Sequence, residues 1–369
     1  SVDEKGGFYG ALAYDGSPVE NADKGCVLNA RILWTFSLAY QVFKDAQYLD
    51  LANRAQQYLV DHFIDKELGG VYWTLDSRGV PKDKDKQTYG IAYSIFGLSE
   101  HYRATQNQES LDEAIALYYC LENRSFDMKN GGYIESFSRD WQKPNRYGYD
   151  GDGIASKTMN THIHVLEAYT NLYQVWKDEG LRKQLAALLN VLIEKVYNPS
   201  THHLMLYFND AWESLEDIDS YGHDIETAWL FNEAAFALGD TELIKKTDVI
   251  SIEIINTAMK EGMNPDGSFI YERNGNIFRR DLSWWCQAEA VNGLLDAWQL
   301  SKDVKYLDAA INTWNWIKLN MVDYKYGEWY STVTVSGGPD IKGLKASLWR
   351  CPYHNSRMGF RVMSFEGIK

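Results

Sequence analysis

A phrase of glycines followed by an aromatic residue recurs along this chain and constrains its fold more than any other feature. The clear copies begin at residues 6, 69 and 131, and weaker copies begin at residues 202, 266 and 326, so successive starts lie 60 to 71 residues apart. Self-similarity at a nearly fixed period indicates a repeat architecture. The clear copies are Gly6-Gly7-Phe8-Tyr9, Gly69-Gly70-Val71-Tyr72 and Gly131-Gly132-Tyr133.

Two helical patterns fill each interval between these phrases. In the first interval, for example, Leu51, Ala55 and Leu59 recur at the spacing of one helix face. Each unit therefore reads as helix, turn, helix and a short Gly-aromatic loop, in which the glycines suit a backbone that turns with φ > 0. The predicted pairs are 28–43 with 48–64, 88–105 with 110–123, 158–176 with 181–197, 222–238 with 241–261, and 283–300 with 304–321.

A single helical segment after Pro352 ends the pattern, and it lacks a partner at the C-terminal end. The simplest closure adds an N-terminal helix to complete a sixth pair, which gives an all-α ring of six helical hairpins. Because the printed sequence begins at the first Gly-aromatic phrase, we expect that helix to be absent from it. An open solenoid, which needs capping repeats, is the second choice. Since no linker or shift in composition divides the chain, residues 1–369 are predicted to form one domain.

The unusual polar and aromatic residues fall near the start of the first helix of each pair. In a closed ring these helices are parallel, so their N-termini open at one end and are expected to gather the residues in one pocket. Helix N-termini also favour negative charge that develops during a reaction. The candidates are Arg31, Tyr89, Asn160, His164, His223, Glu226, Trp284, Trp285, Gln287, Glu289, His354 and Arg357.

Spacing within the helices refines this set. Asn160 and His164 are four residues apart and share a helix face, whereas His162 points away and is expected to be structural. Glu226 follows His223 by three residues and is expected to orient its imidazole. The remaining histidines are interpreted as ordinary structural residues, and the run Lys82 to Lys86 is interpreted as a solvated loop. Those histidines are His62, His101, His202 and His203.

Composition and missing motifs exclude several classes of protein. Aromatic residues make up 14% of the chain, which suits sugar stacking but equally suits a large core. A net charge of −14 argues against nucleic acid and anionic membranes as partners. The chain has no nucleotide-binding glycine motif, no H-E-x-x-H and no Cys/His cluster, so we expect no cofactor and no metal. Paired histidines favour proton transfer over glycoside hydrolysis, which needs two carboxylates.

Five phrases at these positions resemble the N-acylglucosamine 2-epimerase superfamily and, within it, the cellobiose 2-epimerases. They span nearly the whole chain, and the family fold is an (α/α)6 barrel. The phrases are Asn29-Ala30-Arg31, the run 157–169 around Asn160 and His164, Ser220-Tyr221-Gly222-His223-Asp224-Ile225-Glu226, Trp284-Trp285-Cys286-Gln287-Ala288-Glu289-Ala290, and the run 349–357 from Trp349 to Arg357.

This resemblance implies epimerisation at C2 of the reducing-end glucose of a β-1,4-linked disaccharide, through ring opening and a cis-enediolate. His354 and His223 look like the acid/base pair on opposite faces of C2, and His164 looks like the residue that assists ring opening. Arg31 would act with them in catalysis, and Glu226 would support His223. The implied substrate-binding residues are Asn160, Tyr89, Trp285, Trp349, Trp284, Glu289 and Arg357.

Other activities are also compatible with these residues. A mannobiose or mannose 2-epimerase and an aldose–ketose isomerase share the enediolate, and a sugar-binding or hydrolytic α/α barrel would use the histidines only for binding. The Gly- and Asp-rich loop from Trp141 to Ser156 is the expected lid. Scattered cysteines and the absence of a long apolar run favour a cytoplasmic protein, which we expect to be a monomer.

Overall fold

The computed structural model describes residues 1–144, 147 and 153–364. Part of the expected lid, residues 145–146 and 148–152, lies outside these described residues, so the lid stays a prediction. The described chain forms two compact units. The first comprises Ser1–Leu188, Tyr207–Leu215 and Ala346–Tyr353, and the second comprises Leu189–Leu206, Glu216–Lys345 and the chain from His354 onward. The prediction of one domain over residues 1–369 is not tested by this division.

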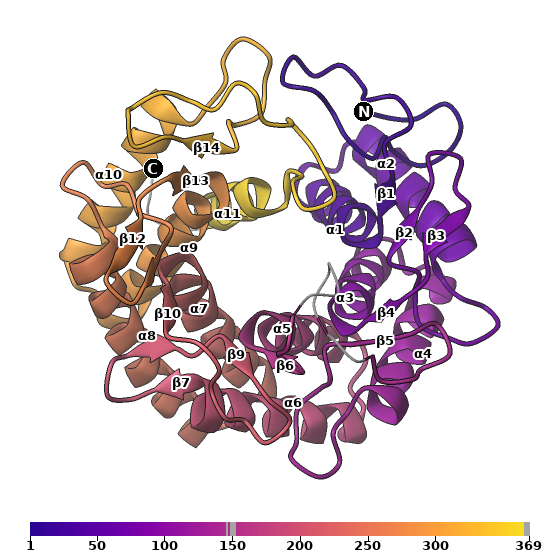
Figure 1. The fold of residues 1–369 in the computed structure, drawn as a ribbon, viewed down its shortest axis with the longest axis horizontal. Helices are drawn as coiled ribbons and strands as arrows, with labels where there is room; N and C mark the ends of the chain where they lie inside the picture. The colour runs from indigo at the N-terminus through magenta and orange to yellow at the C-terminus, as the bar shows by residue number, and fades with distance from the viewer. Residues whose placement is uncertain (145–146, 148–152, 365–369) are drawn as a thin grey trace. The chain divides into compact units, whose positions relative to one another are not determined.

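The first unit is built from antiparallel helix pairs. Its helices α1, α3 and α5 lie side by side, and α2 and α4 pack behind α1 and α3 (Figure 1). The π-helical turn η1 continues α2 by five residues. The helices are α1 (Cys26–Phe43), α2 (Ala46–Tyr58), η1 (Leu59–Phe63), α3 (Thr88–Thr105), α4 (Gln108–Arg124), α5 (Met159–Val175) and α6 (Glu179–Val191), the last of which ends in the second unit.

The second unit repeats the plan. Helix α7 packs on α8 and α9, and α9 packs on α10. The last helix, α11, contacts α7 and α9 through side-chain bonds of Arg357. The helices are η2 (Leu192–Val196), α7 (Tyr221–Leu238), α8 (Thr241–Gly262), α9 (Trp284–Ser301), α10 (Val304–Asn320) and α11 (Tyr353–Ser364), whose first residue belongs to the first unit.

A short strand immediately precedes the first helix of each pair and fixes where that helix begins. Strands β1, β4, β6, β10 and β13 run directly into α1, α3, α5, α7 and α9. Each is hydrogen-bonded antiparallel to another short strand, in the pairs β1–β2, β4–β5, β6–β9, β10–β11 and β13–β14. The strands are β1 (Lys24–Gly25), β2 (Thr74–Leu75), β3 (Pro81–Asp83), β4 (Lys86–Gln87), β5 (Ser136–Phe137), β6 (Lys157–Thr158), β7 (Tyr197–Asn198), β8 (His203–Leu204), β9 (Tyr207–Phe208), β10 (Ile218–Ser220), β11 (Glu272–Asn274), β12 (Ile277–Arg279), β13 (Leu282–Ser283) and β14 (Thr332–Val333).

The prediction that Lys82 to Lys86 is a solvated loop is wrong at both ends, since Lys82 lies in β3 and Lys86 lies in β4. Lys82 is exposed, but Lys86 is fully buried, with Nζ 2.8 Å from Oδ2 of Asp65. Asp65 opens the Gly69-Gly70 loop, in which both glycines have positive φ, so the ion pair ties this loop to the strand before α3. A buried lysine needs such a partner because its charge loses water on burial. Equivalent pairs are Lys24–Asp3, Lys157–Asp127 and Lys345–Asp323.

None of the helices among the described residues is both long enough and apolar enough to cross a membrane.

Candidate active site

In the first unit, His164 lies at the centre of a cluster of tyrosines and one carboxylate. Its Nδ1 is 2.9 Å from Oε2 of Glu167, and the hydroxyl of Tyr93 lies 3.1 Å from Nδ1 and 3.2 Å from Nε2. Glu167 also accepts hydrogen bonds from the hydroxyl of Tyr353, at 2.7 and 2.9 Å. His164 and Glu167 are both buried. They are three positions apart, so one turn of α5 fixes the pair.

Arg31 reaches the same cluster from α1. Its Nη2 donates to the hydroxyls of Tyr89 and Tyr93, and its Nη1 donates to the backbone oxygen of Trp349 at 2.8 Å. The guanidinium also lies over the rings of Tyr93 and Tyr353, 4.4 and 4.7 Å from their centroids. Such stacking suits a buried guanidinium because aromatic faces attract cations. The structure thus brings together predicted residues from α1, α3, α5 and the segment before α11.

Two predicted groups in this unit carry a buried polar atom that has no hydrogen-bond partner among the described residues. They are Oδ1 of Asn160 and Nε of Arg31. A buried polar atom without a partner is costly, and in a binding site a ligand can supply the partner. The indole of Trp349 packs between the rings of Tyr89 and Trp73, with centroids 5.8 and 5.6 Å away.

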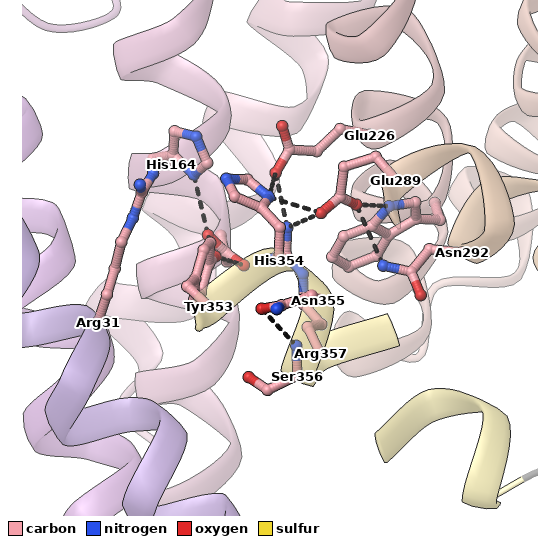
Figure 2. A network of polar contacts seen from close by, with 12 residues as sticks. Arg31, His164, Glu226, Glu289, Asn292, Tyr353, His354, Asn355, Ser356 and Arg357 are labelled. Atoms are coloured by element: carbon pink, nitrogen blue, oxygen red, sulfur yellow. Dashed lines mark hydrogen bonds and ion pairs between the residues drawn. The ribbon is translucent and has the colours of Figure 1, made fainter. Parts of the chain in front are cut away.

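In the second unit, Glu289 is the centre of a charged network around His354 (Figure 2). Its Oε1 is 2.7 Å from Nδ1 of His354 and accepts a 2.7 Å bond from Nη2 of Arg357. Its Oε2 accepts bonds from the indole N–H of Trp229 and from Nδ2 of Asn292. Burial alone would raise the pKa of Glu289, but the charges of Arg357 and His354 hold that pKa well below its usual range. The carboxylate therefore stays ionised beside the imidazole.

Glu226 belongs to this network through Arg357. Nη2 of Arg357 donates to Oε1 of Glu226 at 2.7 Å, and Nδ1 of His354 lies 4.0 Å from the same oxygen. The predicted support of His223 by Glu226 stays a prediction, since Glu226 accepts its hydrogen bond from Arg357.

The ligand atoms of Glu226, Glu289 and His354 lie within 4.8 Å of one another, as in a metal site. However, the guanidinium of Arg357 already binds both carboxylates. A cation in that position neutralises them and opposes a second positive charge. The donor set therefore suits a guanidinium better than a metal ion.

His223 stands in a different environment from His354. Its Nδ1 lies 2.7 Å from the hydroxyl of Ser220. Its ring packs on the indole of Trp285, with the centroids 4.6 Å apart. The ring of His354 packs on the same indole at 5.7 Å, and Trp284 approaches His354 edge-on at 6.4 Å. Two of the predicted histidines thus flank one tryptophan.

The other histidines behave mainly as predicted. Nε2 of His162 accepts a bond from the backbone N–H of Tyr133, and burial lowers the pKa of His162 to about 4, so it is a neutral structural residue. Burial also lowers the pKa of His101 to about 4. His203 differs. Burial is the largest single influence and lowers its pKa, but the hydrogen bond and charge of Asp224, together with Asp219 and Glu261, outweigh burial and raise the pKa to about 9.

Sequence reasoning missed several members of the site, and spacing could have revealed some of them. Glu167 follows His164 by three residues, as Glu226 follows His223, and Tyr93 follows Tyr89 by four. Asn292 follows Glu289 by three residues, so the same spacing could have revealed it. No local signal points to Trp229, because it lies on α7 and its partner Glu289 lies on α9.

Comparisons with known proteins show the family of this chain. The family model for N-acylglucosamine 2-epimerase (GlcNAc 2-epimerase) matches residues 7–354. The chain is 44% identical to the cellobiose 2-epimerase of Bacteroides fragilis, over 98% of this chain and 92% of that protein. It is 39% identical to the cellobiose 2-epimerase of Ruminococcus albus, over 98% of this chain and 93% of that protein.

A solved structure extends the likeness to three dimensions. The cellobiose 2-epimerase of Bacillus thermoamylovorans B4167 superposes with a TM-score of 0.94 at 40% identity, over 98% of this chain and 93% of that chain. The predicted all-α helical-barrel class and the predicted isomerase class are confirmed by these likenesses. The chain belongs to the N-acylglucosamine 2-epimerase family.

Proposed function

We propose that this chain is a 2-epimerase that converts the reducing-end glucose of cellobiose to mannose without a cofactor. One observation carries the proposal. The rings of His223 and His354 pack on the same indole, that of Trp285, and each has its Nδ1 within 2.7 Å of a fixed oxygen. Two anchored imidazoles beside one aromatic platform suit proton removal and proton return at a single carbon.

The proposed reaction moves protons only. One imidazole takes the C2 proton of the ring-opened aldehyde, and the C2–H electron pair enters the enediolate. The other imidazole then gives a proton to the opposite face of C2, while the first retains the proton that it removed. Since Nδ1 of each ring is held, we assign both transfers to Nε2 of His223 and His354. No electron leaves the sugar, so the step needs no oxidant.

Ring opening and enediolate stabilisation are assigned to the first unit. His164, held by Glu167, is proposed to assist ring opening. Arg31 and Asn160 are proposed to hold substrate oxygens, which is supported by the buried, unpartnered Nε and Oδ1 of these residues. A C2 proton is too weakly acidic for imidazole unless donors stabilise the developing negative charge.

The remaining predicted residues divide into two groups. Trp285, Trp349, Trp284 and Tyr89 are proposed to contact the sugar rings, because aromatic faces pack on their apolar faces. Glu289 and Arg357 were predicted to bind substrate, but their bonds to His354 and Glu226 favour a role in holding His354.

The substrate is proposed to be a free β-1,4-linked disaccharide, and the enzyme is proposed to act as a cytoplasmic monomer that binds neither nucleic acid nor membrane. The net charge of −14 supports the exclusion of anionic partners.

The test is incubation with cellobiose in deuterated buffer, followed by proton NMR of the reducing end. We expect the mannose epimer to appear with deuterium at C2. A ketose product would indicate an aldose–ketose isomerase, and release of glucose would indicate a hydrolase. Turnover of mannose or mannobiose alone would keep the chemistry and overturn the substrate.

A further inference from the structure

Ser220, the residue before α7, does not cap that helix with its side chain. Ser220 occupies the N-cap position, where a serine hydroxyl ordinarily accepts a hydrogen bond from the backbone of the first turn. Its side chain makes no such cap bond. Instead its Oγ lies 2.7 Å from Nδ1 of His223, the third residue of the helix. By contrast Thr158, at the N-cap of α5, accepts from the backbone N–H of Thr161 at 3.1 Å.

The surrounding packing restricts the imidazole from a second direction. The indole of Trp285 lies 4.6 Å from the ring of His223, centroid to centroid. This close approach requires Gly222, because a Cβ at that position would lie 2.7 Å from the Trp285 ring. The ring of His223 is thus restricted by the tilted indole of Trp285 and by the hydroxyl of Ser220 at Nδ1.

The backbone that carries Ser220 is itself anchored on both sides. On one side, Asp219 pairs with Arg273 across β10 and β11. On the other side, the buried carboxylate of Asp224 binds Nδ1 of His203 at 2.7 Å and accepts from the backbone N–H of Leu204 at 2.9 Å. Ser220 is 1% exposed and lies between these anchors, so the backbone that carries its hydroxyl is held in place.

We propose that Ser220 is a positioning residue that sets the tautomer of His223. Its hydroxyl accepts the Nδ1–H bond, so Nε2 carries the lone pair when the ring acts as base. The Ser220 hydroxyl can also accept from the imidazolium, because Nδ1 still carries a hydrogen in that form. The same bond to Ser220 therefore suits both proton removal and proton return. This inference rests on the proposed acid/base role of His223.

The forfeited helix cap supports this assignment. A capping bond contributes stability to the helix start, and α7 gives it up for a bond to a side chain.

The experiment compares S220A, S220T and the control S283A with the wild type. Ser283 is also an N-cap serine without a side-chain cap bond, at the start of α9. We expect S220A to lower kcat for C2 epimerisation about 10-fold with KM unchanged, which corresponds to one hydrogen bond. S220T, which keeps a hydroxyl, should recover most of that loss. S283A should change kcat by less than about 2-fold, because Ser283 has no proposed role in holding a catalytic histidine.

The tautomer is read directly from the ¹⁵N chemical shifts of His223, independently of activity. In the wild type we expect hydrogen on Nδ1 and a lone pair on Nε2, and in S220A a mixture of both tautomers. A folded S220A protein with the wild-type tautomer and wild-type kcat would overturn the inference. A wild-type protein that exchanges no C2 proton would instead overturn the proposed function, and the ¹⁵N shifts would still decide the role of Ser220.

Discussion

The starts of α7 and α11 hold their histidines by opposite means. His354, on α11, is held by a carboxylate from α9, which is itself held by Arg357, Trp229 and Asn292. His223, on α7, is held by the hydroxyl of a residue only three positions earlier. A carboxylate partner places a negative charge beside the imidazole, whereas a hydroxyl partner places none there. The difference indicates that the orientation of His354 depends on the charge of Glu289, whereas the orientation of His223 depends on the local geometry at the start of α7.

The largest expected effect comes from removing the charge beside His354. E289Q keeps the shape of Glu289 but removes the ion pairs with His354 and Arg357, so we expect kcat to fall about 100-fold. The measurement is steady-state epimerisation of cellobiose. The matched control is D296N on the same helix, which weakens a buried carboxylate bonded to Arg361 and should lower stability while leaving kcat near the wild-type value. If E289Q and D296N reduce kcat equally, charge at His354 is not the cause.

Glu167 tests whether a histidine of the first unit also depends on the charge of a carboxylate partner. Glu167 holds His164 at 2.9 Å, so E167Q should lower kcat about 30-fold if a carboxylate-held histidine depends on charge. A variant with wild-type kcat would show that the dependence is confined to His354.

The contact between His203 and Asp224, which anchors the start of α7, predicts that the free energy of unfolding changes with pH. Folding raises the pKa of His203 from its ordinary 6.5 to about 9, so the stabilisation is complete below pH 6.5 and is lost as pH rises through 9. Because Glu261 and Arg273 in this network are partly exposed, we expect a loss of about 1–2 kcal/mol. Urea unfolding at pH 6 and pH 10 measures it, and H203N should flatten the difference. An equal pH dependence in H203N would contradict this origin.

The smallest effect is expected for Tyr353. Y353F removes the hydroxyl that donates to both oxygens of Glu167 but leaves the bond between Glu167 and His164, so kcat should fall about 3-fold. Y306F is the control, since the hydroxyl of Tyr306 bonds Asn256 on the helix pair α8 and α10 and should not affect kcat. A loss in Y353F as large as that in E167Q would show that the hydroxyl, and not the carboxylate charge, holds His164.

The helices could be predicted from sequence because each buries a periodic apolar face. The predicted pair 222–238 with 241–261, for example, corresponds to α7 and α8 within one residue. The two π-helical turns could not be predicted, since they depend on how the ends of α2 and α6 pack. The buried state of Lys86 was missed because its partner Asp65 lies in the preceding repeat.

The candidate site could be predicted as a set of residues but not as a set of contacts. His164, His223 and His354 stand out as polar residues at equivalent helix starts, which a repeat reveals. Which oxygen each histidine meets depends on side chains that are up to 65 positions away, as for Glu289 and His354. Long-range partners of this kind leave no periodic signal.

The most direct test of the central claim measures C2 proton exchange in H223A and H354A. Each variant is incubated with cellobiose in deuterated buffer, and binding of cellobiose is measured separately by calorimetry. We expect the wild type to incorporate deuterium at C2, and either substitution to abolish exchange while binding remains measurable. Exchange at the wild-type rate in either variant would contradict the assignment of that histidine to proton transfer.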